Sequence, residues 1–497
     1  MGMRLASILV LLLLIPGALG AHVAQLSPRE LAAAATDVVV AVVEGREVRW
    51  NGKHTLLMTD YALRVEDRLR GEAPERLTLT LPGGTLGDVT DEVCTSVRLE
   101  TGARYLLFLG DLGRPSLSPV VGAWQGVFRE SPDFPEVVAA ARDLVERTPF
   151  APRRAAANSV STLPAKIWKP VAEPFVYEEP AHPPIVVNPL LPGTEFSPVD
   201  QERMTYWNLY AGDLFRVSPN PTATWSYGNG VFDIVGFPSD QQMTAQFEVS
   251  WGDLGEGVLG VAFVRRRDGA VAEADVALNP AKAWTLDDLA ATVRGGPYSF
   301  REVMTHEIGH MWGLDHPFET QEAWWDSVMQ YKTKIYYFGT IYADDAMAAR
   351  KAFPPGVKLR DGLVSSYITV WDRFLNAYLP AAPKAPNAKA GGSFSLTGPI
   401  KIENVGTVVL ANPKVEVYLA PQRLSFEGAV KVKTIRAAGN LASGATKKVS
   451  VGKVRIPGNL PAGTYWLAFY LRDSKDAWQA NNASWSNYDV TLTVTGR

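Results

Sequence analysis

Hydrophobic and polar positions follow different periods along this chain of 497 residues, and each change of period marks a change of predicted structure. From residue 22 to 149 the chain consists mostly of short apolar runs bounded by turn residues, which predicts β-strands. These runs lie at residues 38–43, 77–81, 105–109 and 120–128. A helical period at residues 134–147 closes the segment. We therefore predict a mainly β module over residues 22–149.

The middle of the chain follows a stretch rich in proline, alanine and charge, residues 150–198, which we interpret as a linker. From residue 199 to 379 helical and strand periods are mixed, which predicts an α+β domain. Its first helix is expected at residues 201–217, with Met204, Trp207, Ala211 and Leu214 on the buried face. Strands are expected at residues 231–235, 244–251, 258–265 and 271–278, and later helices at 344–353 and 365–378.

In the last part of the chain, apolar and polar positions alternate. Residues 380–388 are rich in proline and alanine and form a second predicted linker. Residues 389–497 then alternate between apolar and polar positions, which is typical of an all-β sandwich. The predicted fold class is therefore multidomain: a mainly β module, an α+β domain and a β-sandwich.

Composition agrees with this picture and excludes some partners. A chain of this length is expected to hold about three domains, and its 46% hydrophobic and 20% charged residues are ordinary for globular protein. The formal net charge of −3 gives no reason to expect binding to nucleic acid or to an anionic membrane. Cys94 is the only cysteine, so no disulfide forms within the chain.

The N-terminus predicts export. Arg4 precedes an apolar run at residues 8–15, and residues 18–20 are small enough for a cleavage site, so residues 1–20 are interpreted as a secretory signal peptide. An uncleaved anchor is the alternative, but the run is short for a bilayer span. We expect a secreted protein, extracellular or periplasmic, with no membrane span after removal of the signal.

Candidate chemistry is concentrated at residues 299–331. Ser299 and Glu302 form a capping-box pattern at the start of a helix. His306 and His310 are then one turn apart and lie on the same side of the helix, so that both can bind one Zn²⁺. Glu307 lies beside them as a general base for a metal-activated water. A glycine, Gly313, can end the helix in a left-handed turn and return a third histidine, His316, to the same metal.

This HExxHxxGxxH stretch, together with residues 326–331, resembles the metzincin zinc endopeptidases and their Met-turn. The resemblance implies that Met329 forms the floor of the metal site. Residues 343–349 resemble the start of the last catalytic-domain helix of matrixins, the subfamily most similar to this chain. Tyr331 matches the spacing of a tyrosine that ligates zinc or stabilises the oxyanion in astacins and serralysins. A packing role for Tyr331 is the alternative, since matrixins do not generally use such a residue.

The resemblance also bears on metals, latency and substrate. The domain has no histidines outside the motif for a second zinc, so a single catalytic zinc is expected. A calcium ion at Asp275 remains open, with a surface or hydrogen-bonded role as the alternative. In metzincins an edge strand pairs with extended substrate, and residues 273–279 are the candidate edge. Cys94 is either an unreactive thiol, packed or at the surface, or a cysteine switch that caps the zinc, although residues 92–96 do not resemble the matrixin switch motif.

The two flanking regions have their own expectations. Accessory, pro-domain, substrate-binding and surface-binding roles are all open for the N-terminal module. Residues 389–497 resemble a bacterial adhesion-related Ig-like domain of the CARDB type, and a cell-surface or matrix ligand of these β modules remains open. The resemblance thus implies a secreted zinc endopeptidase acting on protein or peptide. The competing hypothesis is a non-catalytic adhesion or scaffolding protein built on the same fold.

Overall fold

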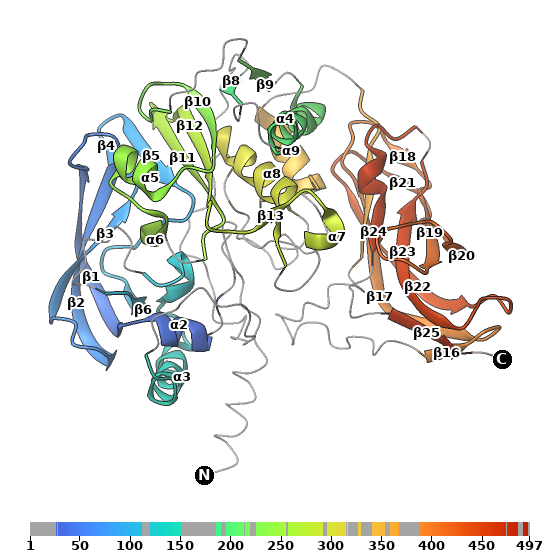
Figure 1. The fold of residues 1–497 in the computed structure, drawn as a ribbon, viewed down its shortest axis with the longest axis horizontal. Helices are drawn as coiled ribbons and strands as arrows, with labels where there is room; N and C mark the ends of the chain where they lie inside the picture. Colours follow the sequence, from blue (N-terminus) through green and yellow to red (C-terminus); the bar gives the residue numbers. More distant parts are fainter. Residues whose placement is uncertain are drawn as a thin grey trace.

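The computed structural model places three regions side by side (Figure 1). The structure describes residues 26, 28–111, 120–150, 185–189, 195–212, 214–218, 225–254, 257–291, 296–314, 316, 327–329, 340–352, 358–366, 387–473, 475–485 and 491–495. The predicted signal peptide and most of the first predicted linker lie outside these residues. Several separate β-sheets are present, so the predicted β-rich, multidomain class is confirmed at that level.

The N-terminal module is built on a five-stranded sheet in the order β3-β2-β1-β6-β7. Helices α2 (Pro28–Ala34) and α3 (Phe134–Arg147) pack on one face, where the apolar stripe of α3 is buried. The predicted helix at residues 134–147 is confirmed. The predicted strand at 120–128 is wrong in part, since a turn at residues 121–122 and the 3₁₀ helix η1 (Ala123–Gly126) replace its middle, and only its end belongs to β7. The strands are β1 (Asp37–Trp50), β2 (Leu57–Arg70), β3 (Arg76–Pro82), β6 (Arg104–Leu109) and β7 (Val127–Arg129).

The central region is built on a seven-stranded sheet in the order β4-β5-β11-β12-β10-β8-β9. Two of these strands, β4 (Gly84–Leu86) and β5 (Val89–Val93), come from the N-terminal module. The others are β8 (Ile185–Asn188), β9 (Phe215–Val217), β10 (Phe232–Gly236), β11 (Gly260–Arg267) and β12 (Ala270–Leu278). Because β8 belongs to this sheet, its residues are part of the central fold rather than of a linker. The expected edge at residues 273–279 is wrong, since β12 lies between β11 and β10.

Helices cover both faces of this sheet. On one face α4 (Ser197–Ala211), α8 (Phe300–Met311) and α9 (Ala343–Ala352) share the largest core of the molecule. On the other face lie α5 (Asp240–Phe247) and α6 (Trp251–Leu254). The strand expected at 244–251 is therefore wrong. Ser239 and Gln242 form a capping box that starts α5, and this local signal overrides the apolar run. The first helix ends at Ala211, and residues 215–217 form β9 instead.

Small elements connect the central sheet to α8. They are β13 (Trp284–Thr285), α7 (Asp288–Ala291) and β14 (Tyr298–Ser299). The chain enters α8 directly from β14, and the ring nitrogen of Trp207 on α4 donates to the carbonyl of Thr305 at 2.9 Å. Helix α4 therefore fixes the position of α8 on the sheet.

The C-terminal region consists of further sheets around one apolar core. Strand β15 (Gly362–Ser366) pairs with β17 (Ser393–Asn404), so residues 365 and 366 are strand and not helix; residues 367–378 of that expected helix lie outside the described part. The remaining elements are β16 (Asn387–Lys389), β18 (Leu410–Ala411), β19 (Lys414–Ala420), β20 (Val430–Arg436), β21 (Asn440–Leu441), β22 (Thr446–Arg455), β23 (Gly463–Leu471), η3 (Gln479–Asn482), β24 (Ala483–Trp485) and β25 (Thr491–Thr495). Across the part of the chain that the structure describes, no helix is long and apolar enough to cross a membrane.

Candidate metal centre

Helix α8 carries the histidine motif and is buried along almost its whole length. The hydroxyl of Ser299 accepts a hydrogen bond from the backbone N–H of Glu302 at 3.3 Å, which confirms Ser299 as the N-cap. After Met311 the helix ends, and Gly313 has a φ of +104°, a conformation that favours glycine. This turn reverses the chain and places His316 beside the helix that carries His306.

The three histidines of the motif converge on one point. Their Nε2 atoms lie 2.9 Å apart for His306 and His310, 3.0 Å for His306 and His316, and 3.1 Å for His310 and His316. All three side chains are buried. Two nitrogens bound to one zinc at 2.0–2.1 Å and a tetrahedral angle are about 3.3–3.4 Å apart, so the observed spacing is of the right size for a shared ion.

Backbone carbonyls fix which ring nitrogens face one another. Nδ1 of His306 lies 2.8 Å from the carbonyl of Val328, and Nδ1 of His310 lies 2.6 Å from that of Leu314. A carbonyl only accepts, so these Nδ1 atoms carry the protons and the Nε2 atoms present lone pairs. Burial lowers the pKa of His310 to about 4, which keeps its ring neutral at pH 7. A buried set of converging lone pairs fits a cation, and the cluster could bind a metal ion.

Met329 lies against the middle of α8. A Cβ built on Gly309 would lie 2.3 Å from the sulfur of Met329, so only glycine allows this approach. Met329 is buried, and its turn includes Val328, whose carbonyl holds His306. Met329 thus packs on the helix that carries the first two histidines, and its role as the floor of the metal site stays a prediction.

A buried carboxylate on α9 holds this turn in place. Asp345 accepts hydrogen bonds from the N–H of Val328 at 2.8 Å and from the hydroxyl of Ser327 at 2.5 Å. It also accepts from the N–H of Tyr342 at 2.9 Å, and burial raises its pKa to about 6. Sequence reasoning noted the stretch that contains Asp345 but gave this residue no role. The chain of contacts from Asp345 through Val328 orients the ring of His306.

Glu307 lies where β11 passes α8. Its side chain is fully buried, and a Cβ built on Gly260 of β11 would lie 2.8 Å from Oε1 of Glu307. Burial raises the pKa of Glu307 to about 8, while the contact with the thiol of Cys94 acts in the opposite direction. A cation held by the histidines would favour the ionised form and lower this pKa again.

The thiol of Cys94 is brought into the same site by the N-terminal module. Its sulfur lies 3.7 Å from Oε2 of Glu307. Cys94, Glu307 and His310 form a second group whose potential ligand atoms all lie within 4.8 Å of one another. The two residues that meet here are 213 positions apart, so the sequence holds no local signal for the contact.

Tyr331 and Asp275 are also candidates from the sequence. Tyr331 lies outside the described residues, so its predicted catalytic role stays a prediction. Asp275 is buried, accepts a hydrogen bond from the ring nitrogen of Trp225 at 2.7 Å and lies opposite Asp233 on the neighbouring strand. Burial raises the pKa of Asp275 well above its usual value. Asp275 is in neither of the groups of three or more potential metal ligands found among the described residues, which favours the hydrogen-bonded alternative over calcium.

No protein-family model and no curated protein matches this chain. Two solved structures of OgpA from Akkermansia muciniphila show a weak similarity. The catalytically inactive protein in complex with an O-glycopeptide (glycodrosocin) substrate is 12% identical over 65% of this chain and 98% of that chain, with a TM-score of 0.19. The wild-type protein is 12% identical over 65% and 96%, with a TM-score of 0.16. Scores this low carry no argument about fold or function.

Proposed function

We propose that this chain is a secreted zinc endopeptidase of the metzincin type, most similar to matrixins. The observation that carries the proposal is the convergence of three Nε2 atoms within 3.1 Å beside the buried carboxylate of Glu307. Three histidine ligands leave a tetrahedral metal one open position, which is characteristic of catalytic zinc sites.

Each residue of the site has a distinct role in this proposal. When bound, zinc supplies Lewis acidity that polarises a peptide carbonyl and acidifies water near neutral pH. Glu307 accepts the proton of the attacking water on a carboxylate oxygen and later delivers it to the nitrogen of the leaving amine. His306, His310 and His316 hold the metal through Nε2. Met329 and Asp345 act as positioning residues, because they fix the turn that orients His306.

The wider fold supports the same assignment. The strand order β11-β12-β10-β8-β9, with α4 and α8 on one face, brings an antiparallel strand next to the zinc-binding helix. A strand there suits recognition of extended peptide by backbone pairing. The proposal includes export by residues 1–20 and an Ig-like C-terminal region that docks or positions the peptidase. Partners are therefore protein or peptide substrates.

The test combines metal content with cleavage of an unstructured protein. Purified chain without residues 1–20 should hold one zinc, and His310→Ala should lose it. Casein cleavage is measured in the intact sequence and in Cys94→Ala, because Cys94 contacts Glu307. Glu307→Gln should retain zinc and lose cleavage by several orders of magnitude. Zinc binding with no cleavage in either background, and none after the N-terminal module has been displaced from the site, would instead favour the non-catalytic adhesion or scaffolding protein.

A further inference from the structure

The strand nearest the metal centre would be a sheet edge without the N-terminal module. In the order β4-β5-β11-β12, the module supplies the neighbours that cover β11. Strand β5 pairs with β11 in antiparallel register from Val93 opposite Phe263 to Val89 opposite Arg267. An edge strand presents unpaired N–H and C=O groups that extended peptides bind. Strand β5 therefore occupies the position that an incoming peptide strand would take.

Cys94, the residue after β5, contacts both β11 and the carboxylate of Glu307. The N–H of Cys94 donates to the carbonyl of Ala262 at 3.3 Å, and the N–H of Ala262 donates to the sulfur of Cys94 at 3.2 Å. Cys94 therefore binds both the N–H and the carbonyl of Ala262. The same sulfur lies 3.7 Å from Glu307. A peptide cannot pair with β11 at Ala262 and reach Glu307 while Cys94 is in place.

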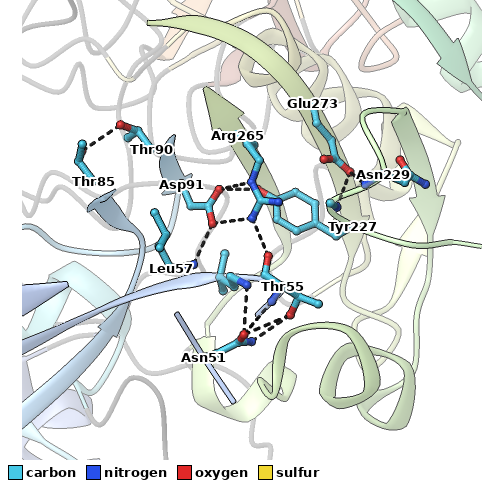
Figure 2. Close-up of polar contacts among 12 residues, drawn as sticks. Asn51, Thr55, Leu57, Thr85, Thr90, Asp91, Tyr227, Asn229, Arg265 and Glu273 are labelled. Carbon is cyan, nitrogen blue, oxygen red and sulfur yellow. Dashed lines mark hydrogen bonds and ion pairs between the residues drawn. The ribbon is translucent and has the colours of Figure 1, made fainter. Parts of the chain in front are cut away.

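A buried ion pair fastens the strand beside this contact (Figure 2). Arg265 of β11 binds Asp91 of β5 through two hydrogen bonds of 2.7 and 2.8 Å, and both side chains are buried. The same guanidinium donates to the carbonyl of Thr55 at 2.6 Å and lies over the ring of Tyr227. Asp91 also accepts from the N–H of Leu57 at 2.8 Å. Residues from both regions therefore complete one closed polar network.

A shared apolar core and a helix cap add to this docking. Leu56, Met58 and Val93 of the module belong to the same buried cluster as Phe247 and Phe263 of the central region. The loop that joins β1 to β2 also caps the C-terminus of α5. Its contacts are Asn51 to the carbonyl of Phe247, Thr55 to that of Gln246, and Lys53 to those of Thr244 and Ala245. These contacts do not depend on the covalent connection through residues 151–184.

We propose that the β5–Cys94 segment is a built-in occupant of the peptide-binding edge, and that the N-terminal module remains docked there when the connecting segment is cut. The peptide nature of the excluded ligand rests on the proposed function; the docking does not. Cutting residues 151–184 alone leaves the site covered, and access requires withdrawal of Cys94 and β5 from β11. The module therefore acts as an intramolecular inhibitor that stays part of the fold.

The docking is tested on the full chain with a specific protease site inserted between residues 151 and 184. After complete cleavage the two pieces should co-elute in gel filtration without denaturant. Hydrogen exchange of the amides in Gly260–Arg267 should remain as slow as in the uncut chain, and the Cys94 thiol should react with a disulfide reagent about 100-fold more slowly than in urea. Separation of the pieces, or fast exchange in β11 after cutting, would overturn the proposal.

The inhibition is tested by loosening the docked strand while keeping the module. Arg265→Met removes the cation that binds Asp91 of β5 and should increase casein cleavage by about tenfold or more, whereas Arg129→Met, which removes an exposed ion pair within the module, should behave as the unmodified chain. Measurable but equal cleavage by the unmodified chain and Arg265→Met, with Cys94 reacting faster in the variant, would overturn the inhibitory role and leave the peptidase proposal standing. Failure to bind zinc would overturn the peptidase proposal alone, because co-elution, exchange and thiol reactivity need no metal.

Discussion

The central region contacts both of its neighbours through buried polar groups, but the two interfaces differ in kind. The N-terminal module adds strands to the central sheet and pairs the charge of Arg265 with that of Asp91. The C-terminal region instead contacts helices α4 and α9. There Tyr210 donates to Asp361 at 2.7 Å, and the N–H of Ala343 donates to Glu403 at 2.9 Å.

This difference decides what each interface controls. The N-terminal interface ends at Cys94 and Glu307, so in our proposal it governs access to the candidate metal centre. The C-terminal interface holds Asp361, whose pKa is raised to about 7 by burial and by nearby Asp476. Asp361 accepts hydrogen bonds from Tyr210 and Asn481, whereas Asp91 binds the guanidinium of Arg265. We expect site access to respond to changes at the first interface and pH-dependent stability to respond to changes at the second.

The largest expected effect comes from breaking the N-terminal ion pair. Arg265→Met leaves the carboxylate of Asp91 buried without its cation, and loss of one partner of a buried pair costs about 3–5 kcal/mol. Denaturant unfolding should show this loss, and the thiol of Cys94 should react faster in the native state. A loss below about 1 kcal/mol would contradict the importance given to this pair.

The matched control replaces both partners. Asp91→Leu with Arg265→Met removes the two charges together and should recover part of the lost stability, because apolar residues often replace a buried ion pair without cost, while the N–H of Leu57 and the carbonyl of Thr55 lose their partners. If the double variant is no more stable than Arg265→Met, the defect lies in these lost hydrogen bonds and in packing around Tyr227 rather than in the unpaired charge.

The next prediction concerns the C-terminal interface, where the free energy of unfolding should depend on pH through Asp361. The folded state raises the pKa of Asp361 from 3.8 to about 7, so it binds a proton that the unfolded chain has released. Its contribution to stability is fully present below pH about 4 and is lost as pH rises toward 7. The slope is at most about 1.4 kcal/mol per pH unit. Asp361→Asn should remove this component.

The measurement is the free energy of unfolding of the unmodified chain minus that of Asp361→Asn from pH 4 to 8. This difference should fall with rising pH up to about 7 and then level off. A flat difference would show that Asp361 does not titrate in this range. Native-state reactivity of Cys94 should be the same in both proteins, since Asp361 belongs to the interface remote from Glu307.

The same contrast explains what the sequence could predict. His306 and His310 are placed by helix geometry, and the turn at Gly313 returns His316 to them, so a few consecutive residues define the whole cluster. The contact between Cys94 and Glu307 joins distant strands and depends on the order of the whole sheet. That order also made residues 273–279 the wrong choice of edge, because alternation identifies a strand but not its neighbours.

A smaller loss is expected from Tyr210→Phe. This change removes the hydroxyl that donates to Asp361 at 2.7 Å and keeps the ring that packs against Tyr206. A buried hydrogen bond of this type contributes about 1 kcal/mol. Denaturant unfolding at pH 6 checks the value, and the effect should be smaller in the Asp361→Asn background. Equal losses in both backgrounds would show that the hydroxyl stabilises the protein by another contact.

The smallest effect concerns the exposed part of the N-terminal interface. The ammonium of Lys53 donates to the carbonyls of Thr244 and Ala245 at 3.0 and 2.8 Å, at the C-terminal end of α5. A cation there satisfies carbonyls that lack helical partners and interacts with the helix dipole. Lys53→Met should cost about 0.3–1 kcal/mol at low salt and less at high salt, whereas Lys53→Arg should cost less than Lys53→Met. A loss that does not change with salt would assign the role of Lys53 to packing of its aliphatic stem. The charge of Lys53 would then make no contribution to the N-terminal interface, which Arg265, Asp91 and the shared apolar core hold together.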